Sequence, residues 1–265
     1  MKPGYFVIPI DICIWAVKNM AYSKLQLYLY LKTNSPKGFC IIDNNLVIKY
    51  CELVNISKSS FYNHMNFLIK SKLIYKISDN GVIVQAFIKL FKFIPFTTNK
   101  GVVFEEVLPS DFKGFIIASI ITYYGSLKKK AERKKELKRG NCIIGKKRTN
   151  YRSTIPFFTL EHTYLAKCLN ISKASAQKLR IHACKSGFIT SKHCFIRIEI
   201  DKAQLNNYRK YSAINPFSLI LIKGKVFQQE SDKLTSSITL RKLFKIKYHF
   251  YSKNRYQLKK GYKGN

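Results

Sequence analysis

The stretch Asn55–Ser60, with the sequence NISKSS, returns 115 positions later as NISKAS at Asn170–Ser175. Similar residues precede both copies, Tyr50–Val54 in the first and Leu165–Leu169 in the second. Lys-Ser-Lys-Leu-Ile comes after the first copy, and Lys-Ser-Gly-Phe-Ile comes after the second at the same distance. A repeat of this length and register indicates one supersecondary unit that is used twice.

The spacing of apolar residues predicts two short helices in each copy. In the first copy, the apolar residues of Tyr50–Val54 share one helical face, and those of Phe61–Leu68 recur at intervals of four and three. Asn55 and its counterpart Asn170 stand between the two helices, where a tight turn needs a left-handed backbone that Asn tolerates well. The pattern therefore predicts a helix, a sharp turn and a second helix.

The residues after the turn predict the start of the second helix and a β-hairpin beyond its end. Ser57 and Ser172 stand where an N-cap hydroxyl would bind free backbone amides of that helix. In the first copy, Leu73–Ile77 and Val82–Ile88 are rich in β-branched and aromatic residues. The intervening Asp-Asn-Gly at 79–81 predicts the turn of the hairpin, because such a turn favours positive φ angles.

These residues resemble the winged helix-turn-helix family. The family pattern Leu-Ala-x-x-Leu-Gly-Ile-Ser-x-x-Thr-Val-x-x-x-Leu, closed by Gly-Leu-Ile, is met twice, with Asn in place of the first Gly in both copies. Ahead of the first motif, Tyr5–Pro9, Ser23–Tyr28 and Lys37–Ile41 occur in an order similar to that of helix-turn-helix proteins in plasmid and phage replication loci. The resemblance covers residues 5–90 closely and 105–200 more loosely, and it implies DNA binding.

The expected fold class is α+β, with two tandem winged helix-turn-helix domains and a C-terminal basic β-hairpin extension. The second copy has a basic insertion at about 128–150, which is interpreted as a phosphate-binding arm. The alternative is a helix that buries an apolar stripe from Phe112 to Leu127 and whose basic end is only solvated. Phe244–Phe250 alternate apolar and basic residues, which favours an amphipathic strand over a surface that stacks single-stranded bases. The expected domains are a first winged helix at 1–91, a linker at 92–106, a second winged helix at 107–200 with the basic insertion at about 128–150, and a basic β-rich extension at 201–265.

The charge of the chain requires a polyanionic partner. Its 265 residues contain 48 Lys and Arg against 14 Asp and Glu, a formal net charge of +34. Together with two helix-turn-helix patterns, this excess favours nucleic acid over an anionic membrane surface. No apolar run approaches the roughly 18 residues of a membrane-spanning helix. The N-terminus, interrupted by Pro3, Pro9 and Asp11, is not expected to be a signal peptide. The expected location is cytoplasmic, in association with the nucleoid.

Neither a metal site nor an enzyme is expected. Seven cysteines without regular spacing are typical of reduced thiols. His182, Cys184, His193 and Cys194 are the strongest zinc candidates, but they form no Cys-x-x-Cys pair. Gly140–Lys146 match the frame of a phosphate-binding loop, yet Lys comes next where magnesium binding requires Ser or Thr. No cofactor, small-molecule ligand or cluster of catalytic carboxylates is expected.

The second helix of each copy is the expected DNA-reading element, because in winged-helix proteins this helix enters the major groove. The alternative for each residue is a solvated helix face. Arg180 aligns with the expected core residue Met65, which would rotate the second helix. The expected contacts are Ser57, Lys58, Ser59, Tyr62, Asn63 and Asn66 in the first copy, with Lys76 near its hairpin, and Lys173, Ser175, Gln177, Lys178 and Arg180 in the second copy, with Lys192 and Arg197 around its hairpin.

These features allow three functional classes. The preferred one is a double-stranded DNA-binding protein of a plasmid or phage that acts as replication initiator or replisome organiser. The second is a transcription regulator, which would use the same surface. It is less favoured because the sequence contains no evident ligand-sensing domain. The third is a structural protein that coats, or is packaged with, nucleic acid without sequence preference. A homodimer and proteins of the replication machinery are the further partners that the resemblance allows.

Overall fold

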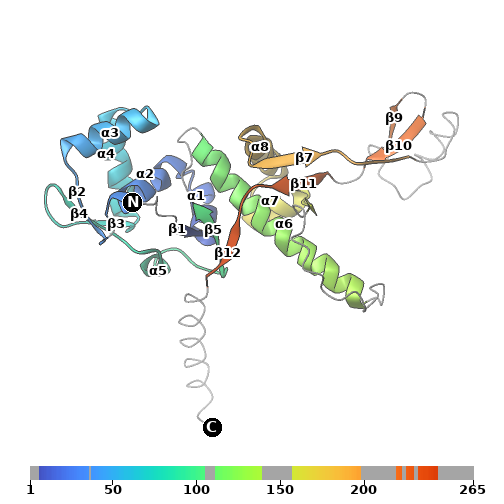
Figure 1. Cartoon of the computed structure of the whole chain (residues 1–265), viewed down its shortest axis with the longest axis horizontal. Coiled ribbons are helices and arrows are strands. Elements are labelled where there is room, and N and C mark those ends of the chain that lie inside the picture. The colour runs from blue at the N-terminus through green and yellow to red at the C-terminus, as the bar shows by residue number, and fades with distance from the viewer. Residues whose placement is uncertain are drawn as a thin grey trace, which may run out of the picture. The chain divides into compact units, whose positions relative to one another are not determined.

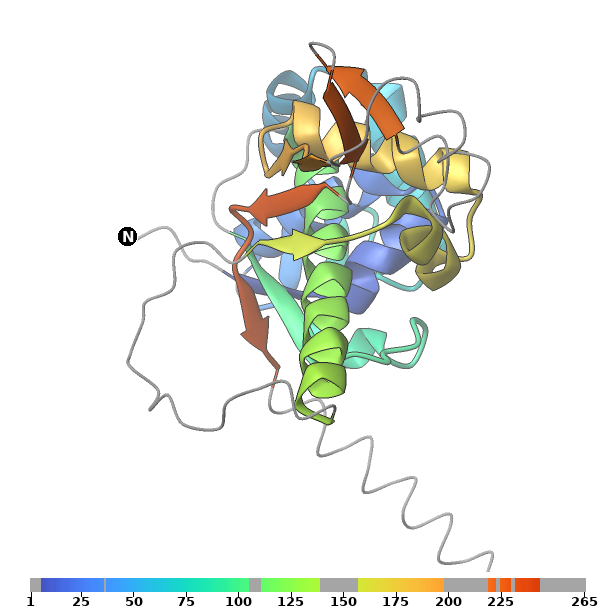
Figure 2. The same ribbon diagram turned by 90° about the vertical axis from the view of Figure 1, so that its right-hand side faces the viewer.

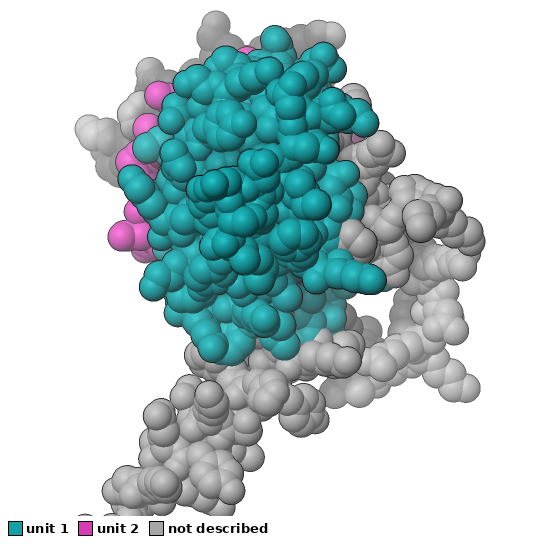
Figure 3. Space-filling model, turned by 90° about the vertical axis from the view of Figure 1, so that its left-hand side faces the viewer, with its two compact units in different colours: residues 1–123, 238–265 teal, residues 124–237 magenta. Residues whose placement is uncertain are grey.

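The computed structural model describes residues 6–35, 37–104, 111–138, 157–197, 219–222, 225–229 and 232–243. Helices and four small antiparallel sheets make up the described chain, which is an α+β protein as predicted (Figure 1). The chain divides into two compact units, drawn in different colours in Figure 3. Unit 1 contains residues 1–123 and 238–265, and unit 2 contains residues 124–237.

Unit 1 contains the first copy of the repeated motif and two three-stranded sheets, of order β2-β4-β3 and β1-β5-β12. Its core includes the fully buried Tyr28, Tyr50 and Phe61. The elements are β1 (Phe6–Pro9), α1 (Ile10–Lys18), α2 (Tyr22–Asn34), β2 (Phe39–Ile41), α3 (Asn44–Val54), α4 (Lys58–Lys70), β3 (Ile74–Lys76), β4 (Gly81–Val84), α5 (Phe87–Leu90), β5 (Lys100–Phe104), the first part of α6 (Phe112–Lys138) and β12 (Leu240–Lys242).

Unit 2 contains the second copy and two further sheets, of order β6-β11-β7 and β8-β10-β9. The pairing of β7 with β11 can be followed in Figure 1, and that of the two orange strands β9 and β10 in Figure 2. The elements are the second part of α6, β6 (Phe158–Thr159), α7 (His162–Leu169), α8 (Lys173–Lys185), β7 (Ile189–Lys192), β8 (Phe195–Arg197), β9 (Leu219–Ile222), β10 (Lys225–Gln229) and β11 (Lys233–Ser236).

The predicted helix, turn and capped helix are confirmed in both copies. Asn55 has φ 54° and ψ 57°, and Asn170 has φ 55° and ψ 53°, so both adopt the left-handed conformation. Ser57 accepts a hydrogen bond from the amide of Ser60 at 3.1 Å, and Ser172 accepts one from Ser175 at the same distance. Each serine thus binds one of the amides that a helix N-terminus leaves without an intrahelical partner.

The backbone equivalence continues past the end of the second helix. Ser71 and Ser186 end α4 and α8 with identical angles, φ −79° and ψ 1°. The next residue is left-handed in both units, Lys72 with φ 58° and Gly187 with φ 78°. The repeat therefore extends from the first helix to the strand after the second.

The predicted hairpin of unit 1 is present, but its turn differs from the prediction. β3 and β4 pair with Tyr75 opposite Ile83, and the amide of Ile77 donates to the carbonyl of Gly81 at 2.9 Å. Neither Asn80 nor Gly81 has a positive φ. The position is crowded instead, because a Cβ at residue 81 would lie 2.5 Å from the Ser78 hydroxyl oxygen and 3.3 Å from the ring of Phe39.

The hairpin of unit 2 contradicts the prediction in its connectivity. β7 pairs with β11, with Ile189 opposite Ser236, whereas β8 pairs with β10. The segment 193–232 is thus an insertion between the two strands of this hairpin, and it carries the β8-β10-β9 sheet. The expected separate extension at 201–265 is also wrong for its described part. β11 completes a sheet of unit 2, and β12 pairs with β5 in unit 1.

The expected linker at 92–106 is wrong as well, because its second part is a sheet strand. β5 pairs with β1 along four residue pairs, from Phe6 opposite Phe104 to Pro9 opposite Gly101. The buried carboxylate of Asp11 binds the loop that precedes β5. It accepts hydrogen bonds from the amide of Thr97 at 2.9 Å and from the hydroxyl of Thr98 at 2.7 Å. Strand pairing and these hydrogen bonds make the segment part of unit 1.

The basic insertion begins as a helix. α6 starts with the buried residues Phe112, Ile116 and Ile120 and continues to Lys138, which agrees with the helical alternative for 128–138. No helix in the described part of the chain is long and apolar enough to cross a membrane. The remainder of the insertion at 139–150, the start of the extension expected at 201 and the strand expected at 244–250 lie outside the described residues.

Candidate nucleic-acid interface

Helix α4 has one buried side and one polar side. Phe61, Met65 and Leu68 are buried against the body of unit 1. Positions three and four apart lie on one face of a helix, so the outward side chains form a continuous strip. This strip comprises the exposed residues Lys58, Ser59, Tyr62, Asn63 and Asn66, all of which the sequence predicted as contacts.

The first turn of α4 is held by local hydrogen bonds. The Ser57 hydroxyl caps the helix and lies 3.0 Å from the Ser60 hydroxyl oxygen. The ammonium of Lys58 donates to the side-chain oxygen of Asn44, at the start of α3, at 3.1 Å. The Ser57 hydroxyl is therefore used as a helix cap. The Lys58 contact is exposed, so an anion could take the place of the Asn44 oxygen.

Helix α8 presents a similar strip built from different residues. Ala176 and Ala183 are its buried residues, at the positions of Phe61 and Leu68 in α4. Ile181, at the position of Asn66, is 47% exposed, so the end of this strip is apolar. The Ser175 hydroxyl lies 2.9 Å from that of Ser172. Among the predicted contacts, Lys173, Ser175, Gln177 and Lys178 are exposed.

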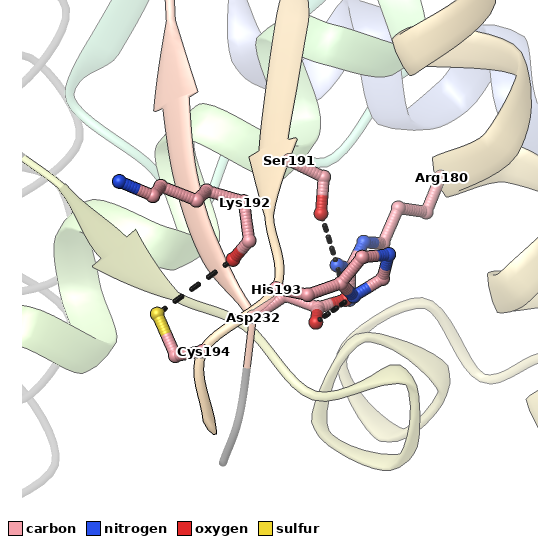
Figure 4. A network of polar contacts seen from close by, with 6 residues as sticks. All are labelled: Arg180, Ser191, Lys192, His193, Cys194 and Asp232. Atoms are coloured by element: carbon pink, nitrogen blue, oxygen red, sulfur yellow. Dashed lines mark hydrogen bonds and ion pairs between the residues drawn. The ribbon is translucent and has the colours of Figure 1, made fainter. Parts of the chain in front are cut away.

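Arg180 contradicts the prediction that it contacts DNA, because its guanidinium is directed into unit 2. It donates to the hydroxyl of Ser191 on β7 at 2.9 Å and forms an ion pair with Asp232, which precedes β11. The side chains of Arg180 and Asp232 are only 11% and 15% exposed. His193 Nδ1 lies 2.7 Å from the other carboxylate oxygen of Asp232 (Figure 4). The network therefore joins α8 to both strands of the second hairpin where the insertion begins and ends.

The charges around this network shift two pKa values. Partial burial acts to raise the pKa of Asp232, but the hydrogen bond from His193 and the charge of Arg180 outweigh it, so the pKa is lowered. Burial, followed by the charge of Arg180, lowers the pKa of His162. The arrangement favours an ionised Asp232 beside a neutral His162.

The two hairpins differ in how their basic residues are placed. Lys76 lies 3.2 Å from Asp79 in an exposed pair, which contributes little stability. Lys192 is exposed on β7 and stands directly opposite Lys233 of β11, which is also exposed. Like charges placed opposite each other across a sheet are unfavourable unless an anion lies between them. Arg197 lies on β8, away from this pair in sequence and pairing, and its side chain is outside the described residues.

Lys233 is a candidate contact that the sequence did not reveal. It is 41 positions beyond Lys192, and no turn motif links the two strands. The basic part of α6 adds exposed lysines at 130, 134 and 135. Lys128, in contrast, binds Glu161 at 2.9 Å, and Lys129 donates to the carbonyl of Phe157 at 2.9 Å. Only part of the basic run is therefore directed to solvent.

The positive charge is concentrated in the second half of the chain. Residues 1–123 contain 14 Lys and Arg against seven Asp and Glu, whereas residues 124–265 contain 34 against seven. Within the described residues, no group of three or more His, Cys, Asp or Glu side chains could hold a metal ion. Comparisons with protein-family models, curated proteins and solved structures find no match to this chain.

Proposed function

We propose that the protein binds double-stranded DNA through two winged helix-turn-helix domains, and that it serves a plasmid or phage as replication initiator or replisome organiser. One observation carries the proposal. α4 and α8 come after the same left-handed Asn and the same Ser cap, and each turns a strip of polar and basic side chains outward. Two such helices in a chain of net charge +34 are suited to double-stranded DNA, which is polyanionic and has a major groove that admits a helix.

In this mechanism the N-terminal halves of α4 and α8 enter the major groove. Asn63 and Asn66 present amides that match the hydrogen-bonding edge of adenine. Lys173 and Lys178 present ammonium groups suited to phosphates or to guanine. Unit 1 then contributes more to base reading, and unit 2 contributes more to affinity.

The second hairpin supplies phosphate contacts next to the groove. A phosphate placed between Lys192 and Lys233 would relieve the repulsion between two ammonium groups that stand opposite each other. The exposed lysines of α6 extend the positive surface of unit 2. These contacts fix position on the duplex without reading its sequence.

Footprinting on the DNA that flanks the gene tests the proposal and separates it from the alternatives. Discrete protected repeats at a replication origin support the initiator, and protection of a promoter alone favours a transcription regulator. Uniform protection with a steep salt dependence would instead indicate a nucleic-acid coat.

Base reading is tested by the double substitution Asn63→Ala and Gln177→Ala. Each good base contact contributes about 1–3 kcal/mol of discrimination, so the ratio of specific to non-specific affinity should fall at least tenfold. The matched control is Asn34→Ala, which removes an exposed amide at the end of α2. An equal fall in specific and non-specific affinity would mean that these helices do not read bases.

A further inference from the structure

The β2-β4-β3 sheet of unit 1 has an apolar face that none of the described residues buries. The register places Phe39, Ile83 and Tyr75 in one row across the three strands. Ile41 and Gly81 are opposite each other in the next row, and Ile77 bonds to Gly81 there. The five large side chains, which we call the outer sheet face, are Phe39 (50% exposed), Ile41 (59%), Tyr75 (39%), Ile77 (57%) and Ile83 (39%).

The opposite face of the same sheet is the one that joins the core. Cys40, Ile74, Val82 and Val84 alternate with the residues of the outer sheet face and are buried. An antiparallel sheet with one solvated face normally places polar residues on that face. Apolar residues on both faces therefore indicate that the outer sheet face is covered in the working protein.

Unit 2 provides an internal control for this conclusion. Its β6-β11-β7 sheet has the same order, and Leu234 pairs with Phe158 as Val82 pairs with Cys40. Because both sheets belong to one chain, a general bias of composition cannot explain a difference between them. The residues equivalent to Phe39, Ile41, Tyr75, Ile77 and Ile83 are Phe157, Thr159, Thr190, Lys192 and Thr235. Four of the five apolar residues are thus polar or charged in unit 2.

The surroundings of the outer sheet face favour a partner of the same kind. The neighbouring charges are balanced, since Lys37 and Lys76 are matched by Asp43 and Asp79. Two outer sheet faces can therefore approach each other without placing large charges of one sign in contact.

The size of the outer sheet face is adequate for association. With aromatic side chains covering 150–250 Å² each, the exposed parts of the five residues amount to roughly 500 Å². Two such faces would bury about 1,000 Å² before their rims are counted, which reaches the lower range of specific interfaces.

We propose that the outer sheet face of unit 1 is a self-association surface, on which a second copy of this chain packs face to face. The proposal does not depend on DNA binding. An apolar contact between two strongly basic chains has a distinctive salt dependence, because salt screens their mutual repulsion without weakening apolar burial. Self-association should strengthen as salt rises, whereas binding to DNA should weaken.

The test is sedimentation of the full chain without DNA, at low and high salt. The wild type should form dimers as salt rises. The variant Ile41→Thr, Tyr75→Thr, Ile77→Lys and Ile83→Thr carries the residues of unit 2, and its dimer dissociation constant should rise at least tenfold. The control Leu53→Thr with Ile88→Thr changes two exposed apolar residues of unit 1 outside the sheet, which are 55% and 41% exposed. It should dimerise as the wild type does.

Three outcomes would overturn the proposal: a wild type that stays monomeric at every salt concentration, an unchanged dissociation constant in the fourfold variant, or equal weakening in the control. If the fourfold variant does not fold, Ile83→Thr alone takes its place and should still weaken the dimer. DNA affinity of the same variants at low concentration gives an independent readout. Loss of self-association with DNA binding retained separates this surface from the groove-reading helices.

Discussion

Units 1 and 2 share the backbone of the repeated motif but differ in what surrounds it. The left-handed Asn and the Ser cap recur with angles that agree within a few degrees. The core below the second helix is large and aromatic in unit 1, where Phe61 lies against Tyr50. In unit 2, Ala176 is buried at the equivalent position. The path of the chain is thus set by a few residues at the turn, while the packing below it can change.

The same comparison explains Arg180. Its equivalent in α4 is Met65, a buried apolar residue. In unit 2 the inserted segment returns at Asp232, which supplies a carboxylate for the guanidinium. A charged residue therefore occupies a core position because the insertion brings its partner.

The largest expected effect comes from exchanging the core residues of the two helices. Phe61→Ala should destabilise unit 1 by about 3–5 kcal/mol, because it leaves a cavity beside Tyr50. Hydrogen exchange of the α3 and α4 amides measures the change. Tyr62→Ala, on the neighbouring exposed position, is the control and should alter stability far less.

The reciprocal change, Ala176→Phe, should destabilise unit 2 through overpacking by about 1–3 kcal/mol. Hydrogen exchange of α7 and α8 gives the readout. If Phe were accepted there without loss, the two interiors would be less different than the buried residues indicate.

The next effect concerns the base of the second hairpin. Asp232→Ala leaves Arg180 without its partner and should destabilise the second hairpin by about 2 kcal/mol, less than a fully buried pair because this one lies near the surface. The double variant Arg180→Met with Asp232→Leu replaces the ion pair by two apolar residues, the first being the Met that unit 1 has at this position, and should recover most of the loss. The rate of proteolysis at the hairpin measures the stability of both variants. If the double variant recovered no stability, the ion pair would have a role that apolar packing cannot replace.

Asp232 also predicts a dependence on pH. Its pKa is lowered in the folded protein, so its contribution is present above the unfolded value of about 3.9. The contribution is lost as pH falls through the lower, folded value. An Asp232→Asn variant should therefore show a smaller loss of hairpin protection in acid than the wild type, measured by hydrogen exchange across that range.

The caps should give a smaller and matched effect. Ser57→Ala and Ser172→Ala each remove one hydrogen bond to a helix N-terminus and should cost about 1 kcal/mol. Urea unfolding of each variant, followed by probes in its own unit, checks the equality. A clear inequality would show that one cap has a second role, such as a contact in the folded unit.

The smallest effect is expected at the left-handed residue after the second helix. Lys72→Gly should stabilise unit 1 by a few tenths to about 1 kcal/mol, because glycine adopts φ 58° without strain. The gain is reduced by loss of the Lys72 contact with the ring of Phe93 at 5.3 Å. Thermal unfolding measures the shift, and Lys70→Gly within α4 should act in the opposite direction.

Much of the local structure was predictable, and the errors other than the turn at 79–81 have one cause. The turn at Asn55 and the cap at Ser57 depend on interactions within a few residues, so their pattern is visible in the chain. The linker, the second hairpin and the role of Arg180 depend on partners far along the sequence. Thr97 and Thr98, for example, are predicted to belong to a linker, but in the structure the carboxylate of Asp11 binds them to unit 1.

The sequence by itself determined the two helix pairs, their left-handed turns, their caps and the exposed strips of α4 and α8, because these depend on short-range sterics and on spacing along a helix. Only the tertiary structure decided that β7 pairs with β11, that Arg180 is directed inward to Asp232, and that the outer sheet face of unit 1 is apolar where that of unit 2 is polar. Strand pairing joins residues that are distant in sequence, and the face on which a side chain lies depends on that register. No local pattern carries this information.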